Sequence, residues 1–183
     1  MRIKAVVFDR DGTLIKHIPY LSRPEFVCLL EGVQEGIRKL LQKDIKLFIH
    51  SNQSGVGRGY FTFADAEACN QRMLELLGFK KSPFERICMA PEAPESPAVY
   101  RKPSPLFANE LIVQYGFNAK EMCYVGDRGS DMQTAFNAGT LGIGVDTGLD
   151  NLEEELRELG LRDRYPVFNS FLDVISSILD KDP

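Results

Sequence analysis

The chain has 183 residues, of which 44% are hydrophobic and 26% are charged, a composition typical of a folded globular protein. Its net charge of −4 offers no large basic field to hold a nucleic-acid backbone, so a nucleic-acid partner is not expected. No apolar stretch approaches the roughly 20 residues of a transmembrane helix, and the N-terminal residues lack the apolar core of a secretory signal. We therefore expect a cytoplasmic protein without a membrane partner.

Short apolar strands alternate with helical patterns along the whole chain. In chain order, the sequence predicts a strand at 3–9, a helix at 32–44, a strand at 45–52, a helix at 62–78, a strand at 84–90, a helix at 103–116, a strand at 121–127, a helix at 130–139, a strand at 141–145, a helix at 151–159, an edge strand at 165–168 and a helix at 171–180. Thr62 and Gly78 are the expected caps of the second helix, because a threonine oxygen and a glycine suit these positions.

The alternation predicts the fold class. Strands that are apolar on both faces are typical of a buried parallel sheet, and intervening helices cover its two faces. We therefore expect an α/β protein with a three-layer, doubly wound parallel sheet. The proline-rich segment 89–105 is interpreted as a surface loop and not as a domain boundary, so residues 1–183 are predicted to form a single domain.

Polar side chains follow three of the predicted strands at the point where each ends. They are Asp9 and Asp11 after the first strand, Ser51, Asn52 and Gln53 after the second, and Asp127 and Asp131 after the fourth. In open α/β sheets, ligands bind beyond the carboxyl ends of the strands, so these side chains should lie along one edge. Two aspartates at one strand end are also compatible with a helix-capping turn, but the same chemistry at three strand ends favours a site.

Clustered carboxylates repel one another, so either their pKa values rise or a cation lies among them. Ligands that are all oxygen favour a hard cation, and Mg²⁺ is the usual one. Arg101 and Lys102 precede the third helix and can supply positive charge to an anionic substrate. Taken alone, Lys102 is equally compatible with a solvated surface charge.

Four segments then show a family resemblance. In order, "FDRDGTL", "SNQSG", "RKP" and "GDRGSD" resemble the four motifs of the haloacid dehalogenase (HAD) superfamily of phosphohydrolases, over about residues 3–148. The sequence is most similar to the subgroup of D-glycero-D-manno-heptose 1,7-bisphosphate phosphatases and histidinol-phosphatases. The resemblance implies a Rossmann-like HAD fold and the Mg²⁺-dependent hydrolysis of a small phosphorylated metabolite, such as a sugar phosphate.

The resemblance also implies roles for individual residues. Asp9 is the expected nucleophile, Asp11 the general acid and base, and Ser51 and Lys102 the groups that bind the phosphoryl oxygens. The expected metal site consists of Asp9, Asp11, Asp127 and Asp131, with Asp131 also placed to orient Lys102. The expected substrate contacts are Arg10, His17, Tyr20, Asn52, Gln53, Ser54, Arg101 and Arg128. Core packing for Tyr20 and a plain surface position for His17 remain alternatives.

The sequence departs from the subgroup in one segment. Members commonly carry a zinc loop with a Cys-x-His pair and a Cys-x-Cys pair before the Arg-Lys-Pro motif. In the matching stretch "CMAPEAPESPAVYRKP" only Cys88 remains, and a tetrahedral site takes four ligands, so no zinc is expected. The form "YRKP", together with "SNQSGVGRG", also resembles polynucleotide 3'-phosphatases, but the acidic chain lacks a basic stripe.

Neither interval between the motifs is long enough for an inserted cap domain. We therefore expect a capless enzyme with an open cleft that is bordered by residues 16–25 and 89–100. The alternatives are a histidinol-phosphatase, a polynucleotide 3'-phosphatase and, in another class, a non-catalytic protein that binds a phosphorylated metabolite. The presence of both Asp9 and Asp11 argues against the last.

Overall fold

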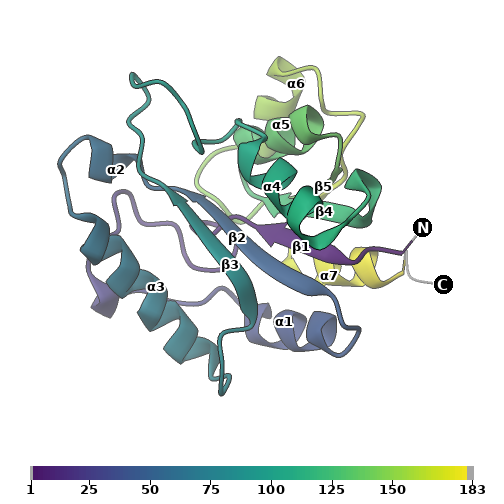
Figure 1. Ribbon diagram of the computed structural model, residues 1–183, viewed down its shortest axis with the longest axis horizontal. Coiled ribbons are helices and arrows are strands. Elements are labelled where there is room, and N and C mark those ends of the chain that lie inside the picture. The colour runs from purple at the N-terminus through teal and green to yellow at the C-terminus, as the bar shows by residue number, and fades with distance from the viewer. Residues whose placement is uncertain (1, 181–183) are drawn as a thin grey trace.

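The computed structural model describes residues 2–180 and contains a six-stranded sheet (Figure 1). Its strands are β1 (Ala5–Phe8), β2 (Lys46–Asn52), β3 (Phe84–Ala90), β4 (Met122–Gly126), β5 (Leu141–Val145) and β6 (Val167–Phe168). They lie in the order β3-β2-β1-β4-β5-β6, and every neighbouring pair is parallel. The predicted parallel sheet is therefore confirmed.

Helices cover both faces of the sheet. The helices are α1 (Val33–Leu41), α2 (Ser54–Gly57), α3 (Phe63–Leu77), α4 (Leu106–Tyr115), α5 (Gly129–Ala138), α6 (Leu152–Glu158) and α7 (Phe171–Leu179), with single 3₁₀ turns at Pro24–Phe26 and Ala119–Glu121. Buried residues of α1, α3 and α7 form a core on one face, and those of α4, α5 and α6 form a core on the other (Figure 1). The three-layer arrangement is therefore confirmed.

The side-chain alternation of β1 explains why its sequence is apolar without interruption. Val6 and Phe8 point into the core beneath α1, α3 and α7, whereas Ala5 and Val7 point into the core beneath α4, α5 and α6. Successive residues of a strand face opposite sides of a sheet, so a central strand with two covered faces has no polar position. The first polar side chains can appear only where the strand ends.

The cap residues predicted for the helix at 62–78 lie at its two ends in the structure. At α3, the Thr62 hydroxyl and the Asp65 carboxylate form a reciprocal capping box, and Gly78 closes the helix with φ 69°. The short helix α2 and the two 3₁₀ turns were not predicted, because segments of three or four residues are too short to show helical periodicity.

The order of the strands places the carboxyl end of β1 at a topological switch point. The chain runs from β1 to β2 and β3 on one side of the sheet, then crosses to β4 on the other side of β1. Ligands in such sheets bind at this point. Within residues 2–180, all named strands belong to this one sheet, in keeping with the expected capless architecture.

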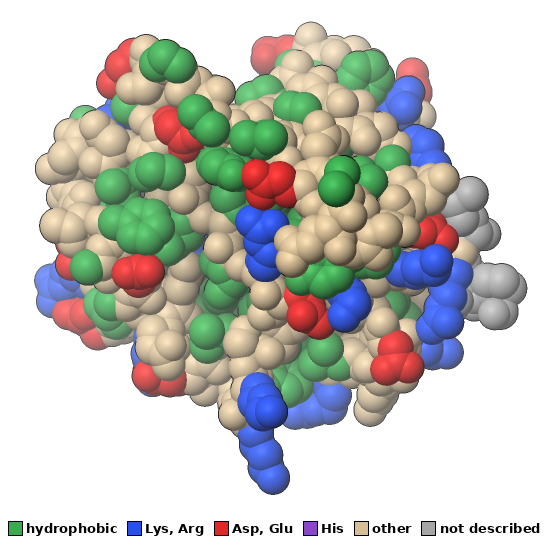
Figure 2. All heavy atoms as spheres, viewed as in Figure 1, with side chains coloured by type: hydrophobic (Ala, Val, Ile, Leu, Met, Phe, Trp, Pro, Cys, Tyr) green, Lys and Arg blue, Asp and Glu red, His purple; other side chains and the backbone are tan. Residues whose placement is uncertain are grey.

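The distribution of surface charge and the character of the helices can be compared with two expectations, that nucleic acid and membrane are not partners. On the face drawn in Figure 2, acidic and basic side chains are interspersed, and the basic ones form no band across it. None of the helices in the described residues is both long enough and apolar enough to cross a membrane.

Candidate active site

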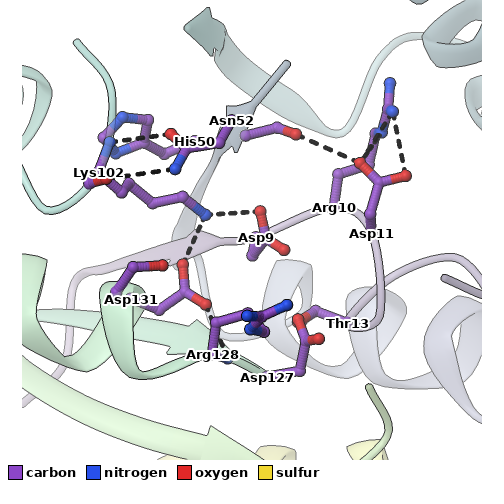
Figure 3. Close-up of polar contacts among 12 residues, drawn as sticks. Asp9, Arg10, Asp11, Thr13, His50, Asn52, Lys102, Asp127, Arg128 and Asp131 are labelled. Atoms are coloured by element: carbon purple, nitrogen blue, oxygen red, sulfur yellow. Dashed lines mark hydrogen bonds and ion pairs between the residues drawn. The ribbon is translucent and has the colours of Figure 1, made fainter. Parts of the chain in front are cut away.

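The residues predicted from the strand ends meet beyond β1, β2 and β4 (Figure 3). At their centre, the Lys102 ammonium donates to Asp9 Oδ1 at 2.6 Å and to Asp131 Oδ1 at 2.5 Å. Lys102 is only 3% exposed. Burial lowers the pKa of Lys102, but the charges of Asp131 and Asp9 outweigh it and hold that pKa above its ordinary value. The lysine therefore carries a buried positive charge.

Three buried carboxylates could hold a metal ion. Asp9, Asp127 and Asp131 each offer an oxygen, and these atoms lie within 4.8 Å of one another. Burial, followed by the charges of Asp9 and Asp131, raises the pKa of Asp127 well above its ordinary value. Burial also raises the pKa of Asp131 to about 6, although Lys102 opposes it.

Only one of the two carboxylate oxygens of Asp127 accepts a hydrogen bond within residues 2–180. Its Oδ1 accepts a hydrogen bond from Thr13 Oγ1 at 3.0 Å, whereas its Oδ2 is buried without a hydrogen-bond partner among the described residues. A buried carboxylate oxygen without a partner is costly. An oxygen donor of this kind, beside two more carboxylates, fits a hard divalent cation.

The main chain of two glycines packs against Asp127 Oδ2. A Cβ atom at Gly12 or at Gly148 would lie 2.2 Å from Asp127 Oδ2, far inside contact distance, and Gly12 has φ 91°, which favours glycine. Thr147 Oγ1 donates to the Gly12 carbonyl at 2.6 Å and ties the two turns together. The turns after β1 and β5 can therefore approach Asp127 only because both glycines lack a side chain.

Asp11 points away from this cluster. Its carboxylate accepts from Arg10 Nε at 2.9 Å, from Arg10 Nη2 at 3.1 Å and from Gln53 Nε2 at 3.0 Å. Arg10 is 1% exposed, and its Nη1 donates to Asn70 Oδ1 at 2.8 Å. The sequence predicts Arg10 as a substrate contact, but here its guanidinium binds Asp11 and Asn70. Positioning Asp11 is therefore the role that its contacts favour.

A cleft of about 370 Å³ opens above the cluster. The expected site residues that line it are Asp9, Arg10, Asp11, His17, Tyr20, Asn52, Gln53, Ser54, Arg101, Lys102 and Arg128. Ser51, Asp127 and Asp131 are buried and do not line it. Residues 17–21 form one wall, as expected, but no residue of 89–100 lines the cleft. This part of the expected border is wrong, because the loop reaches the cleft only at Arg101 and Lys102, and Ser54 and Gly55 of α2 and Phe61 line it as well.

Tyr20 stands at the rim of the cleft and not in the core. It is 48% exposed, has φ 54°, and its ring meets that of Tyr60 edge to face at 4.8 Å. Its hydroxyl accepts a hydrogen bond from Arg58 Nη1 at 3.2 Å. His17 lines the same wall, and its buried Nδ1 has no partner among the described residues.

The two arginines of the cleft differ in how their charge is used. Arg128 forms ion pairs with Asp150 at 2.6 Å and with Glu155 at 3.0 Å. Arg101 Nη1 only makes a 3.4 Å hydrogen bond to the Lys102 carbonyl, and its buried Nε has no partner among the described residues. Arg101 is therefore the better placed of the two to bind a second anionic group.

Several residues of the site were not singled out from the sequence. They are Thr13 beside Asp127, Asn70 beside Arg10, His50 and Glu92 behind Lys102, and Thr147 on Gly12. Thr13 and His50 had a local signal, since Thr13 lies within the motif "FDRDGTL" and His50 is a polar residue in the apolar run that leads into "SNQSG". Asn70 and Glu92 had none, because their partners are distant in sequence or belong to the main chain.

Comparisons with known proteins agree with this geometry. The profile of the HAD-hydrolase-like family matches residues 99–174. A D-glycero-beta-D-manno-heptose-1,7-bisphosphate 7-phosphatase of Helicobacter pylori is 32% identical over 137 residues, which are 74% of this chain and 79% of that protein. A D-glycero-D-manno-heptose-1,7-bisphosphate 7-phosphatase of Thermosynechococcus vestitus is 30% identical over 155 residues, 79% of each chain.

A solved structure extends the similarity to nearly the whole chain. The D,D-heptose 1,7-bisphosphate phosphatase of Bordetella bronchiseptica, crystallised with magnesium and phosphate, is 28% identical and superposes with a TM-score of 0.87 over 98% of this chain and 99% of that one. The family match, the relatives and the shared architecture all agree with the four motifs around Lys102. The chain therefore belongs to the HAD-like hydrolase family and is a phosphatase.

Proposed function

We propose that this single-domain protein is a Mg²⁺-dependent phosphomonoester hydrolase that removes one phosphate from a D-glycero-D-manno-heptose 1,7-bisphosphate. The observation that carries the proposal is the buried Lys102 ammonium, bound to Asp9 and Asp131 beside the partnerless oxygen of Asp127. The site thus combines a carboxylate nucleophile, a fixed positive charge and a place for a hard cation.

Asp9 attacks phosphorus in this proposal and forms an aspartyl-phosphate. Lys102 lies 2.6 Å from Asp9 Oδ1, so its charge can stabilise the phosphoryl oxygens as they gain charge. Ser51 and the main-chain amide of Asn52 bind the same oxygens. Asp9, Asp127 and the main-chain carbonyl of Asp11 would hold Mg²⁺, whose charge would offset the charge of the nucleophile as a dianionic phosphate approaches.

Asp11 is the proposed general acid and base. It protonates the leaving oxygen and then takes a proton from the water that hydrolyses the aspartyl-phosphate. In the structure Asp11 lines the cleft, and its carboxylate is bound to Arg10 and Gln53.

The substrate is proposed from the relatives together with the cleft. The relatives of Helicobacter pylori and Thermosynechococcus vestitus are both named as heptose bisphosphate 7-phosphatases. A bisphosphate carries a second anionic group, and Arg101 has a buried Nε without a partner among the described residues, at the wall of the cleft. His17, Tyr20 and Gln53 line the space between and are proposed to contact the sugar.

The test is phosphate release from a heptose 1,7-bisphosphate, from histidinol phosphate and from an aryl phosphate, with Mg²⁺ and with a chelator. We expect the bisphosphate to be the best substrate and the chelator to stop turnover. Asp9→Asn, which is nearly isosteric, should abolish turnover while leaving the circular dichroism spectrum unchanged. Activity of Asp9→Asn within about tenfold of wild type, a barrier change of only ~1.4 kcal/mol, contradicts the covalent mechanism. A better rate on histidinol phosphate contradicts the substrate.

A further inference from the structure

Residues 99–102 carry Arg101 and Lys102 to the cleft, yet they belong to no helix or strand. Their main-chain polar groups therefore lack the partners that regular secondary structure supplies. Buried peptide groups need hydrogen bonds from some source, since an unpaired one is costly. In this segment three side chains that supply them come from β2 and from the residues just after β3, and Ser104 supplies the carbonyls of Val99 and Arg101.

Glu92 binds the start of the segment. Its Oε1 accepts from the Val99 N–H at 3.0 Å and from the Tyr100 N–H at 2.7 Å. Burial raises the pKa of Glu92, but hydrogen bonds from main-chain N–H groups outweigh it and hold that pKa below its ordinary value. A charged acceptor makes stronger hydrogen bonds than a neutral one. The ionised carboxylate therefore fixes two successive peptide groups.

His50, in β2, binds the next peptide group. Its Nε2 lies 2.7 Å from the Tyr100 carbonyl, and its Nδ1 lies 3.1 Å from the Tyr124 hydroxyl. A carbonyl oxygen only accepts, so Nε2 carries the proton. Burial, followed by the charge of Lys102, lowers the pKa of His50 to about 3. The ring is therefore neutral, and Nδ1 accepts from the tyrosine.

Asn52, at the end of β2, binds the main chain of Lys102 itself. Its Oδ1 accepts from the Lys102 N–H at 2.8 Å, and its Nδ2 donates to the Lys102 carbonyl at 3.3 Å. This side chain thus holds both polar groups of one residue. Lys102 is therefore fixed at both ends, because its ammonium is held by Asp9 and Asp131.

We propose that Glu92, His50 and Asn52 form a side-chain cradle that positions Lys102, and that Glu92 is a positioning residue for the phosphatase reaction. The proposal rests on the proposed role of Lys102. A lysine has a flexible four-carbon stem, so the place of its ammonium depends on where its main chain is fixed. Displacements of about 1 Å at a catalytic group can cost ~10²-fold in rate. The cradle fixes the main chain against β2, which pairs with β1, the strand that leads into Asp9.

The experiment compares Glu92→Ala and Glu92→Gln with wild type on p-nitrophenyl phosphate, in the full chain with Mg²⁺. Glu95→Ala is the matched control, since Glu95 lies in the same loop, is 69% exposed and has only a 3.9 Å ion pair with Arg58. We expect Glu92→Ala to lower kcat about tenfold or more with KM within about threefold, because a displaced Lys102 weakens the transition state more than substrate binding. Glu92→Gln keeps an acceptor oxygen and should stay within about threefold of wild type. The control should be unchanged.

Amide hydrogen exchange supplies a readout that does not depend on activity. The amides of Val99 and Tyr100 should exchange faster in Glu92→Ala than in wild type, and not in Glu95→Ala. If Glu92→Ala does not fold, Glu92→Asp, which is one methylene shorter, should show the same loss of kcat at nearly constant KM.

Lys102→Met separates the two proposals. If it lowers kcat more than about a hundredfold while Glu92→Ala or Glu92→Asp stays within about twofold of wild type, the cradle is overturned and the proposed function stands. If Lys102→Met stays within about tenfold, the role of Lys102 is overturned, and the cradle with it.

Discussion

His50 should make the stability of this protein depend on pH in a way that one substitution removes. The ring is fully buried and neutral, with a pKa lowered from 6.5 to about 3, first by burial and then by the charge of Lys102. The unfolded chain binds a proton at His50 below pH 6.5, whereas the folded protein does not until about pH 3. Stability should therefore be complete above pH 6.5 and fall as the pH is lowered through this window.

The size of the effect follows from the shift. Below an unfolded pKa of 6.5, each pH unit removes about 1.4 kcal/mol from the free energy of unfolding. Between about pH 7.0 and pH 5.5 the contribution of His50 should fall by about 1.3 kcal/mol, because the unfolded residue is only partly protonated near its pKa. Carboxylates titrate over part of the same range, so the total slope does not isolate His50.

A His50→Gln variant isolates it. The glutamine amide can still donate to the Tyr100 carbonyl but cannot titrate, so the variant keeps one contact and loses the pH dependence. The assay is urea unfolding followed by far-ultraviolet circular dichroism, since the chain has no tryptophan for fluorescence. The stability difference between wild type and variant should shrink by about 1.3 kcal/mol between about pH 7.0 and pH 5.5. A difference that stays constant over this range refutes the buried, neutral state of His50.

Three more predictions concern the cleft and its metal site. Asp127→Asn should raise the Tm of the metal-free protein by at least about 2 °C, because it removes a carboxyl group whose ionisation is opposed by burial and by the charges of Asp9 and Asp131. Calorimetry with a chelator checks this, and a lower Tm contradicts it. Arg101→Ala should raise KM for the heptose bisphosphate far more than for an aryl phosphate, and equal effects would place Arg101 at the scissile phosphate instead. Elemental analysis of protein purified without added metal should find no zinc. Burial raises the pKa of the Cys88 thiol to about 12 and so disfavours the thiolate that zinc binds. One zinc per chain that is lost in Cys88→Ser would contradict this prediction.

The layers of the fold could be predicted because local sequence determines them. The strand of Ala5–Phe8 is apolar on both faces, so it had to be central, and polar residues could follow only at its end. The rule that parallel strands end at one edge then places Asp9 and Asp127 together from the sequence pattern. Neither step depends on side-chain detail, which is why both succeeded.

The contacts within the site could not be predicted in the same way. The Arg10 guanidinium binds Asn70, 60 residues away on α3, and nothing in the local sequence distinguishes this from a contact with substrate. Glu92 binds main-chain N–H groups of Val99 and Tyr100, and such partners leave no pattern of side-chain types. The residue types are visible in the sequence, whereas the choice among several partners is made by tertiary packing.

The two glycines at Asp127 have a consequence for any mutational survey of this enzyme. A methyl group at Gly12 or Gly148 would lie 2.2 Å from Asp127 Oδ2, so alanine at either position must displace that carboxylate. Neither glycine has a side chain that can attack, donate or bind. In a saturation screen scored by growth or turnover, both should nevertheless rank with Asp9 and Lys102 among the least tolerant positions. The positions at which substitution abolishes activity would therefore include the main-chain glycines packed against the reacting groups as well as the reacting groups themselves.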